Sequence, residues 1–204
     1  MGLARLFSGP ALQTLFLNYR GEELRSSFVS HLIDAFERNA VNFFVDRHEQ
    51  RGKDIKNLVI RIRESRIALA IFSPRYAESP WCMDELVTMK KLADQGKLLV
   101  IPIFYNVEPE DIRNQTGEFG DNFWTLAKCS TGDQIKNWKE AFQCISEKMG
   151  LSLRAKSSEA DFVKKIVTEV HKATEAIGKE EENQFRKEKE KGREMQLMPI
   201  RSRI

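Results

Sequence analysis

Short apolar runs alternate along this chain with longer stretches in which hydrophobic residues recur every three or four positions. The runs predict five strands, at residues 14–18, 41–45, 67–73, 97–104 and 150–154. The longer stretches predict helices at residues 25–39, 56–65, 83–95 and 158–177, with short aromatic-rich helices between residues 107 and 149.

The third apolar run, IALAIFS at residues 67–73, is hydrophobic on both faces of a strand. Such a strand belongs in a parallel sheet that helices cover on both sides. Together with the alternation of strands and helices, it predicts an α/β fold: a flavodoxin-like, doubly wound, five-stranded parallel sheet with helices on both faces. Folds of this class bind ligands at the carboxyl ends of their strands.

The chain divides into three parts. Residues 1–12 form an N-terminal extension, residues 13–178 the folded domain, and residues 179–204 a tail dominated by charged side chains. This tail has too few apolar residues to fold alone. We expect it to be disordered or to extend the last helix, since Glu and Lys favour helices.

Composition narrows the choice of partners and compartment. The net charge of +3 arises from 33 basic and 30 acidic side chains, so we expect no nucleic-acid partner. No apolar run approaches the roughly 18 to 20 residues that span a bilayer, and we expect no membrane contact. The three cysteines include no C-x-x-C pair, which favours a reducing compartment. We therefore predict a cytoplasmic protein, with the nucleus as a second location.

The familiar catalytic motifs are absent from the sequence. It contains no phosphate-binding P-loop, no G-x-G-x-x-G after the first strand, no nucleophile elbow and no zinc-binding histidine pair. We predict no metal site and no bound cofactor, and any catalysis would depend on carboxylates. The missing phosphate loop also argues against a flavin-binding electron carrier.

The segment SPWCMDEL, at residues 79–86, combines a helix start with candidate chemistry. Ser79 suits an N-cap and Pro80 the first helical position. Helical spacing then places Trp81, Cys82 and Glu85 on one flank, where the fold class binds ligands. The alternatives are a solvated helix-start acid for Glu85, a core position for Trp81 and inert packing for Cys82.

Several long segments, in order, resemble the signature motifs of plant TIR (Toll/interleukin-1 receptor) domains. They are LFLNYRGEELR at residues 15–25, FFVDRHEQRGKDI at 43–55, ESRIALAIFSPRYAESPWCMDEL at 64–86 and VIPIFYNVEPEDIRNQTGEFGDNF at 100–123. The resemblance runs from about Leu15 to Ile177. It implies a TIR-only protein or a truncated disease-resistance receptor.

The resemblance implies an enzyme that cleaves NAD⁺, an NAD⁺ nucleosidase in plant innate immunity. The family's catalytic acid lies in W-C-x-x-E-L, which is Glu85 here, and a fixed carboxylate would stabilise the cationic ribose that remains when nicotinamide leaves. NAD⁺ would be a substrate and not a cofactor. The residues expected to bind it are Arg20, Gly21, Asp46, Trp81 and Cys82. The alternative for Arg20 is an ion pair with a nearby acid.

The family also self-associates, and its activity depends on oligomers. The Ser30–His31 pair resembles part of one such surface, and the region around Gly150 contributes to another. The resemblance therefore also implies an alternative function, that of a non-catalytic adaptor that binds other TIR domains. The chain departs from the family pattern at Asn18, where Ser is usual, in a segment that borders the pocket.

Overall fold

A computed structural model describes residues 14–44, 55–153 and 157–197 of the 204-residue chain. Five strands form one parallel sheet in the order β2-β1-β3-β4-β5. Their bounds are Thr14–Tyr19 (β1), Phe43–Phe44 (β2), Ser65–Phe72 (β3), Leu99–Phe104 (β4) and Leu151–Ser152 (β5). All four strand pairs are parallel, which confirms the predicted flavodoxin-like, doubly wound fold.

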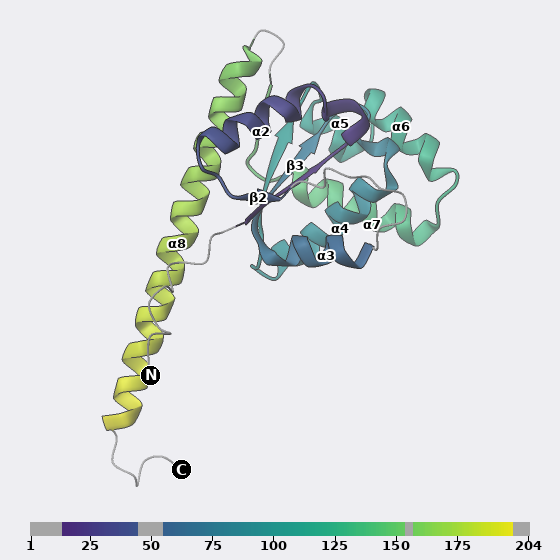
Figure 1. Ribbon diagram of the computed structural model, residues 1–204. Coiled ribbons are helices and arrows are strands. Elements are labelled where there is room, and N and C mark those ends of the chain that lie inside the picture. The colour runs from purple at the N-terminus through teal and green to yellow at the C-terminus, as the bar shows by residue number, and fades with distance from the viewer. Residues whose placement is uncertain (1–13, 45–54, 154–156, 198–204) are drawn as a thin grey trace.

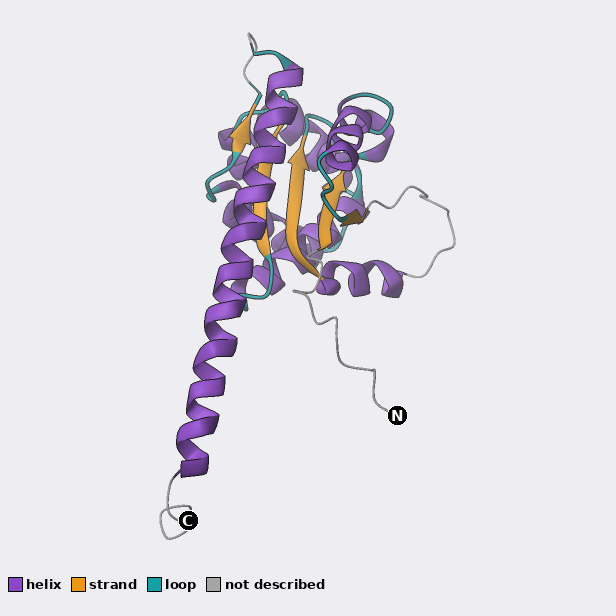
Figure 2. Ribbon diagram, turned by 60° about the vertical axis from the view of Figure 1, so that its left-hand side comes forward, coloured by secondary structure: helices purple, strands orange, loops and turns teal. Residues whose placement is uncertain are grey.

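Helices cover both faces of this sheet (Figures 1 and 2). They are α1 (Gly21–Leu24), α2 (Phe28–Arg38), α3 (Ile55–Glu64), α4 (Pro80–Asp94), α5 (Pro109–Asn114), α6 (Gly117–Ala127), α7 (Gly132–Ser146) and α8 (Glu159–Leu197). A short 3-10 helix, η1 (Tyr76–Glu78), lies between β3 and α4.

The central strand β3 shows why the sheet is buried on both sides. Its side chains point alternately to opposite faces, and nearly all of them are buried. Ala68, Ala70 and Phe72 join a core with α3, α4, α6 and α7. Ile67, Leu69 and Ile71 join a second core with α2 and α8. The predicted two-sided burial of this strand is therefore confirmed.

Two predicted helix boundaries were wrong. The helix expected at residues 25–39 begins only at Phe28, because Ser27 has non-helical backbone angles of −125° and −110°, and the short helix α1 before it was not predicted. The helix expected at residues 83–95 begins three residues earlier, at Pro80. The proposed start at Ser79 and Pro80 is correct.

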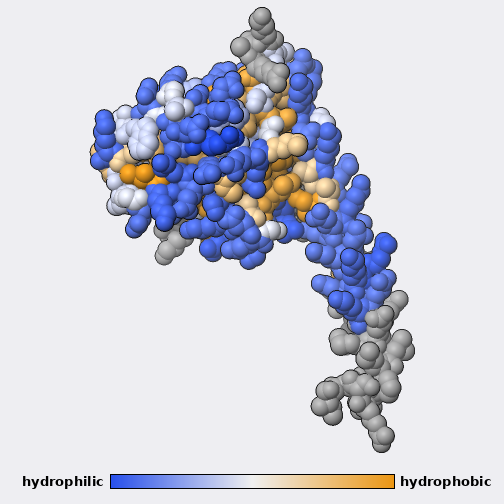
Figure 3. All heavy atoms as spheres, turned by 180° about the vertical axis from the view of Figure 1, so that it is seen from behind, coloured by the Kyte–Doolittle hydropathy of each residue, from blue (hydrophilic) through white to orange (hydrophobic). Residues whose placement is uncertain are grey.

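The last helix extends well beyond the domain. Its first part packs against α2 and the sheet, whereas its second part projects away from the domain (Figures 1 and 2). The charged segment from residue 179 thus continues the helix through Leu197, the second of the two alternatives. Seen from behind, the projecting part is covered mainly by hydrophilic side chains, while hydrophobic residues show on the domain beside it (Figure 3).

Candidate functional site at the carboxyl edge of the sheet

The start of α4 brings the SPWCMDEL segment to the carboxyl edge of β1 and β3. The Ser79 hydroxyl accepts a hydrogen bond from the Cys82 backbone N–H at 3.3 Å, and Pro80 occupies the first turn, where its missing N–H costs nothing. Leu86 and Met89, on the stripe predicted to face the sheet, are fully buried. This packing fixes which way the remaining side chains of α4 point.

Glu85 lies half-buried beside β1. Its Oε2 atom accepts a hydrogen bond of 2.7 Å from Nδ2 of Asn18, a fully buried side chain near the carboxyl end of β1. The same Nδ2 donates to the Cys82 backbone carbonyl at 3.1 Å. One amide group therefore joins the carboxyl end of β1 to both the backbone and the carboxylate of α4.

Tyr76 completes this group from η1. Its hydroxyl lies 2.5 Å from Asn18 Oδ1 and 3.0 Å from the Cys82 carbonyl oxygen. Burial raises the pKa of Tyr76 well above its usual value, and the neighbouring Glu85 carboxylate adds to this rise. At neutral pH its hydroxyl is therefore protonated and able to donate.

Trp81 and Cys82 lie on different sides of the helix start. The Trp81 side chain is 56% exposed, so a core position for Trp81 was wrong. Cys82 is buried, and its thiol donates to the Tyr19 backbone carbonyl at 3.3 Å. Its placement matches the packing alternative, with the sulfur against β1.

Arg20, at the end of β1, forms ion pairs with two acids. Its guanidinium contacts Glu22, and it lies 3.5 Å from a carboxylate oxygen of Glu78. Arg75 forms a two-pronged hydrogen bond with Glu78 at 2.8 and 2.9 Å, which lowers the pKa of Glu78. The ion-pair alternative for Arg20 therefore describes this structure.

A second carboxylate, Glu23, lies close to the end of β3. It accepts a hydrogen bond from the hydroxyl of Ser73, which is buried. Burial raises the pKa of Glu23, and the Ser73 hydrogen bond and Arg75 offset only part of this rise. The edge of the sheet thus holds two partly buried acids, Glu23 and Glu85, in different surroundings.

The other predicted residues are spread more widely. Gly21 is buried at the start of α1, directly after Arg20. Asp46 lies outside the described residues. On α2, Ser30 is half-buried and His31 is exposed, so this surface is open in part.

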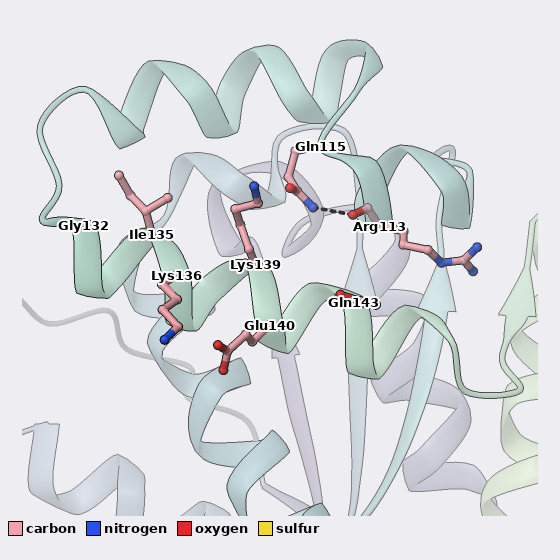
Figure 4. A pocket seen from close by; sticks show the side chains of 8 residues that line it. All are labelled: Arg113, Gln115, Gly132, Ile135, Lys136, Lys139, Glu140 and Gln143. Carbon is pink, nitrogen blue, oxygen red and sulfur yellow. Dashed lines mark hydrogen bonds between the residues drawn. The ribbon is translucent and has the colours of Figure 1, made fainter.

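A depression of about 370 Å³ lies elsewhere, between α5 and α7. Its lining includes Arg113, Gln115, Lys136 and Lys139 (Figure 4). The guanidinium of Arg113 points away from the two lysines, so the positive charges do not converge. None of the residues predicted to bind or cleave NAD⁺ lines this depression.

Two other kinds of site are absent from the part of the chain that the structure describes. Residues 14–44, 55–153 and 157–197 contain no group of three His, Cys, Asp or Glu side chains placed to hold a metal ion. Within the same ranges, no helix combines the length and apolar content that crossing a bilayer requires.

The sequence did not reveal the roles of Asn18 and Tyr76. Asn18 interrupts an otherwise apolar strand, and a buried amide in such a place must satisfy its hydrogen bonds. That signal marks the position, although it does not name the partners. Tyr76 gave no comparable signal.

Comparison with known families decides the identity of the fold. Residues 14–197 match the family described as TIR domain. The chain belongs to the TIR domain family. The predicted resemblance is thereby confirmed.

Relatives of this TIR domain include plant disease resistance proteins. The chain is 57% identical over 158 residues to Disease resistance protein RBA1 of Arabidopsis thaliana, covering 78% of this chain and 44% of that protein. It is 46% identical over 169 residues to Disease resistance protein RPS4 of the same plant, covering 82% of this chain and 14% of that protein. The chain therefore spans less than half the length of these relatives.

Solved structures of TIR domains share the fold. The TIR domains of an activated Roq1 resistosome, described as directly recognising the pathogen effector XopQ, superpose with a TM-score of 0.70 at 34% identity, covering 78% of this chain and 99% of that one. The RPS4 and RRS1 TIR domain heterodimer superposes with a TM-score of 0.50 at 16% identity, covering 79% and 96%. The second likeness supports the fold alone.

Proposed function

We propose that this TIR domain is an NAD⁺ nucleosidase that acts in plant innate immune signalling, with Glu85 as its catalytic carboxylate. The observation that carries the proposal is the half-buried Glu85 carboxylate, held at 2.7 Å by the Asn18 amide at the carboxyl edge of a parallel sheet. The similarity to plant disease resistance proteins supports the biological context.

The proposed reaction breaks the bond between nicotinamide and C1 of its ribose. The bonding electron pair leaves with nicotinamide, which becomes a neutral molecule, and the ribose acquires positive charge. Water then attacks C1 and releases a proton, giving ADP-ribose. The uncharged form of nicotinamide is a good leaving group, so the main need is to stabilise the cationic ribose.

Glu85 meets that need through its charge and position. A carboxylate held in place beside a developing cation lowers the barrier because it needs no reorganisation during the reaction. In glycoside hydrolases, carboxylates act in this way on the anomeric carbon of the sugar, which becomes oxocarbenium-like in the transition state. The exposed indole of Trp81, four residues earlier on α4, offers an aromatic surface to a planar ring.

The proposal also includes self-association with other TIR domains, through a surface that contains Ser30 and His31. His31 is exposed and Ser30 half-buried on α2, which leaves the surface available. A non-catalytic adaptor that uses this surface is the second candidate function. Since NAD⁺ is an intracellular compound, the proposal places the protein in the cytoplasm or nucleus.

The decisive test follows nicotinamide release from NAD⁺ over a range of protein concentrations. Glu85→Gln removes the charge while keeping the shape, and we expect it to lower kcat about 10²- to 10³-fold. Asp94→Asn is the matched control, because it removes an exposed carboxylate at the far end of the same helix. We expect that variant to match the wild type.

If association completes the site, activity per molecule should rise with protein concentration, in step with oligomer mass measured by light scattering. Equal release from wild type and Glu85→Gln would contradict the enzymatic proposal. Absence of release at every concentration, with oligomers present, would favour the adaptor.

A further inference from the structure

We propose that Asn18 is a positioning residue for Glu85, and that Tyr76 in turn fixes the orientation of Asn18. This inference rests on the proposed function, and it adds two residues that the catalytic role of Glu85 would require. Both side chains are fully buried. Asn18, on β1, lies 67 residues before Glu85 in the sequence, and Tyr76, on η1, lies 9 residues before it.

The surroundings of Asn18 permit one orientation of its amide. On one side lie two acceptors, the Glu85 carboxylate and the Cys82 backbone carbonyl, at 2.7 and 3.1 Å from Nδ2. On the other side lies the Tyr76 hydroxyl, 2.5 Å from Oδ1. Exchanging the oxygen and nitrogen would turn an acceptor towards two acceptors, so the carboxylate and the carbonyl fix the assignment, and the Tyr76 hydroxyl then donates to Oδ1.

This orientation uses the full hydrogen-bonding capacity of the Nδ2 group. One N–H anchors the first turn of α4 through Cys82, and the other holds the carboxylate of the residue three positions later. Asn18 pairs with Ala70 on the neighbouring strand β3, so the amide is built into the interior of the sheet. The carboxylate is therefore held by a fully buried side chain of a paired strand.

The chemistry of the amide also suits the proposed reaction. A hydrogen bond from N–H to a carboxylate favours the ionised form. An amide carries no net charge, so it holds Glu85 without cancelling the negative charge that a cationic ribose needs. An arginine or lysine in place of Asn18 would hold the carboxylate but reduce its electrostatic effect.

The first test needs no substrate. The pKa of the Glu85 carboxyl is measured by NMR titration in the wild type and in Asn18→Leu, which keeps a similar volume without a donor. We expect this pKa to rise by about one unit in the variant. Asn122→Leu is the control, because Asn122 donates a comparable hydrogen bond of 3.0 Å to the Pro74 carbonyl. It should leave the Glu85 pKa unchanged.

The second test separates kcat from KM. Asn18→Leu should lower kcat about tenfold or more and change KM little, because a misplaced carboxylate weakens the transition state and not the bound substrate. Tyr76→Phe keeps the aromatic ring and removes the hydroxyl, so it should shift kcat and the Glu85 pKa in the same direction by smaller amounts. Thermal melting confirms that each variant is folded.

Unchanged Glu85 pKa and kcat in folded Asn18→Leu would overturn the proposal. If that variant does not fold, Tyr76→Phe decides instead, and wild-type values for it would overturn the proposal equally. If the wild type releases no nicotinamide, the proposed function fails, and the titration alone still decides whether Asn18 holds Glu85.

Discussion

Gly150, just before β5, occupies a place where the backbone touches β4. A Cβ atom added there would lie 2.4 Å from the Pro102 carbonyl oxygen, 2.7 Å from Pro102 Cγ and 2.9 Å from Phe104 Cε2. Real side chains do not make contacts this short, and the nearest obstacle is backbone, which cannot turn aside. Gly150→Ala should therefore displace the chain from β4.

The size of the effect follows from the overlap. Forcing extra volume into packed structure costs about 1–3 kcal/mol. For a protein of this length, 1 kcal/mol shifts Tm by about 2–4 °C, so Gly150→Ala should lower Tm by about 2–12 °C. The displacement should first break the hydrogen bond from Leu153 N to the Phe104 carbonyl, which is 2.9 Å long.

Differential scanning fluorimetry measures the shift, and amide exchange at Leu153 reports the broken strand pair. Gly178→Ala is the matched control: nothing lies within 4 Å of the added Cβ, and the site is inside α8. Alanine is favoured over glycine in a helix by about 0.5–1 kcal/mol, so this variant should melt higher. A Gly150→Ala protein with wild-type Tm and wild-type exchange at Leu153 would refute the reasoning.

Two further predictions concern partly buried polar contacts. Because burial raises the pKa of Glu23, the stability that this group contributes is complete below the unfolded pKa of about 4.3 and is lost as pH rises through the folded pKa. Glu23→Gln should therefore raise the free energy of unfolding at pH 7, and with it Tm. The gain should be less than about 1 kcal/mol, since the group is half-exposed, and it should vanish below about pH 4. A lower Tm at pH 7 would contradict this. Trp138→Phe removes the indole N–H that donates to Asp84 at 2.7 Å and should cost about 1–3 kcal/mol by urea denaturation. A double-mutant cycle with Asp84→Asn that shows no coupling would contradict that estimate.

Local patterns predicted most elements of this fold. The apolar residues on both faces of β3 predicted that strand, and the N-cap at Ser79 and the apolar stripe predicted α4. The same method missed α1 and began the next helix at residue 25, three residues before α2. Leu24 and Phe28 are four residues apart and both buried, so the hydrophobic spacing runs on across the non-helical Ser27.

The candidate site was predictable only in part. The position of Glu85 follows from helical spacing and from the motif it shares with TIR domains. Its contact with Asn18 joins residues 67 positions apart, and the contact between Tyr76 and Asn18 spans 58. No periodicity connects residues at such separations, because their meeting depends on how β1, β3 and α4 pack. Only the amide of Asn18, in an apolar strand, indicated that a hydrogen-bonding partner from elsewhere in the chain was needed.

The outer strand β5 spans two residues, Leu151–Ser152. An edge this short offers few free N–H and carbonyl groups to an incoming strand, so another chain would gain little by extending the sheet on this side. An assembly that forms on this side would then join through the side chains of helices and loops. Its geometry would be set by surface shape and charge, and single surface substitutions could redirect it while leaving the fold unaltered.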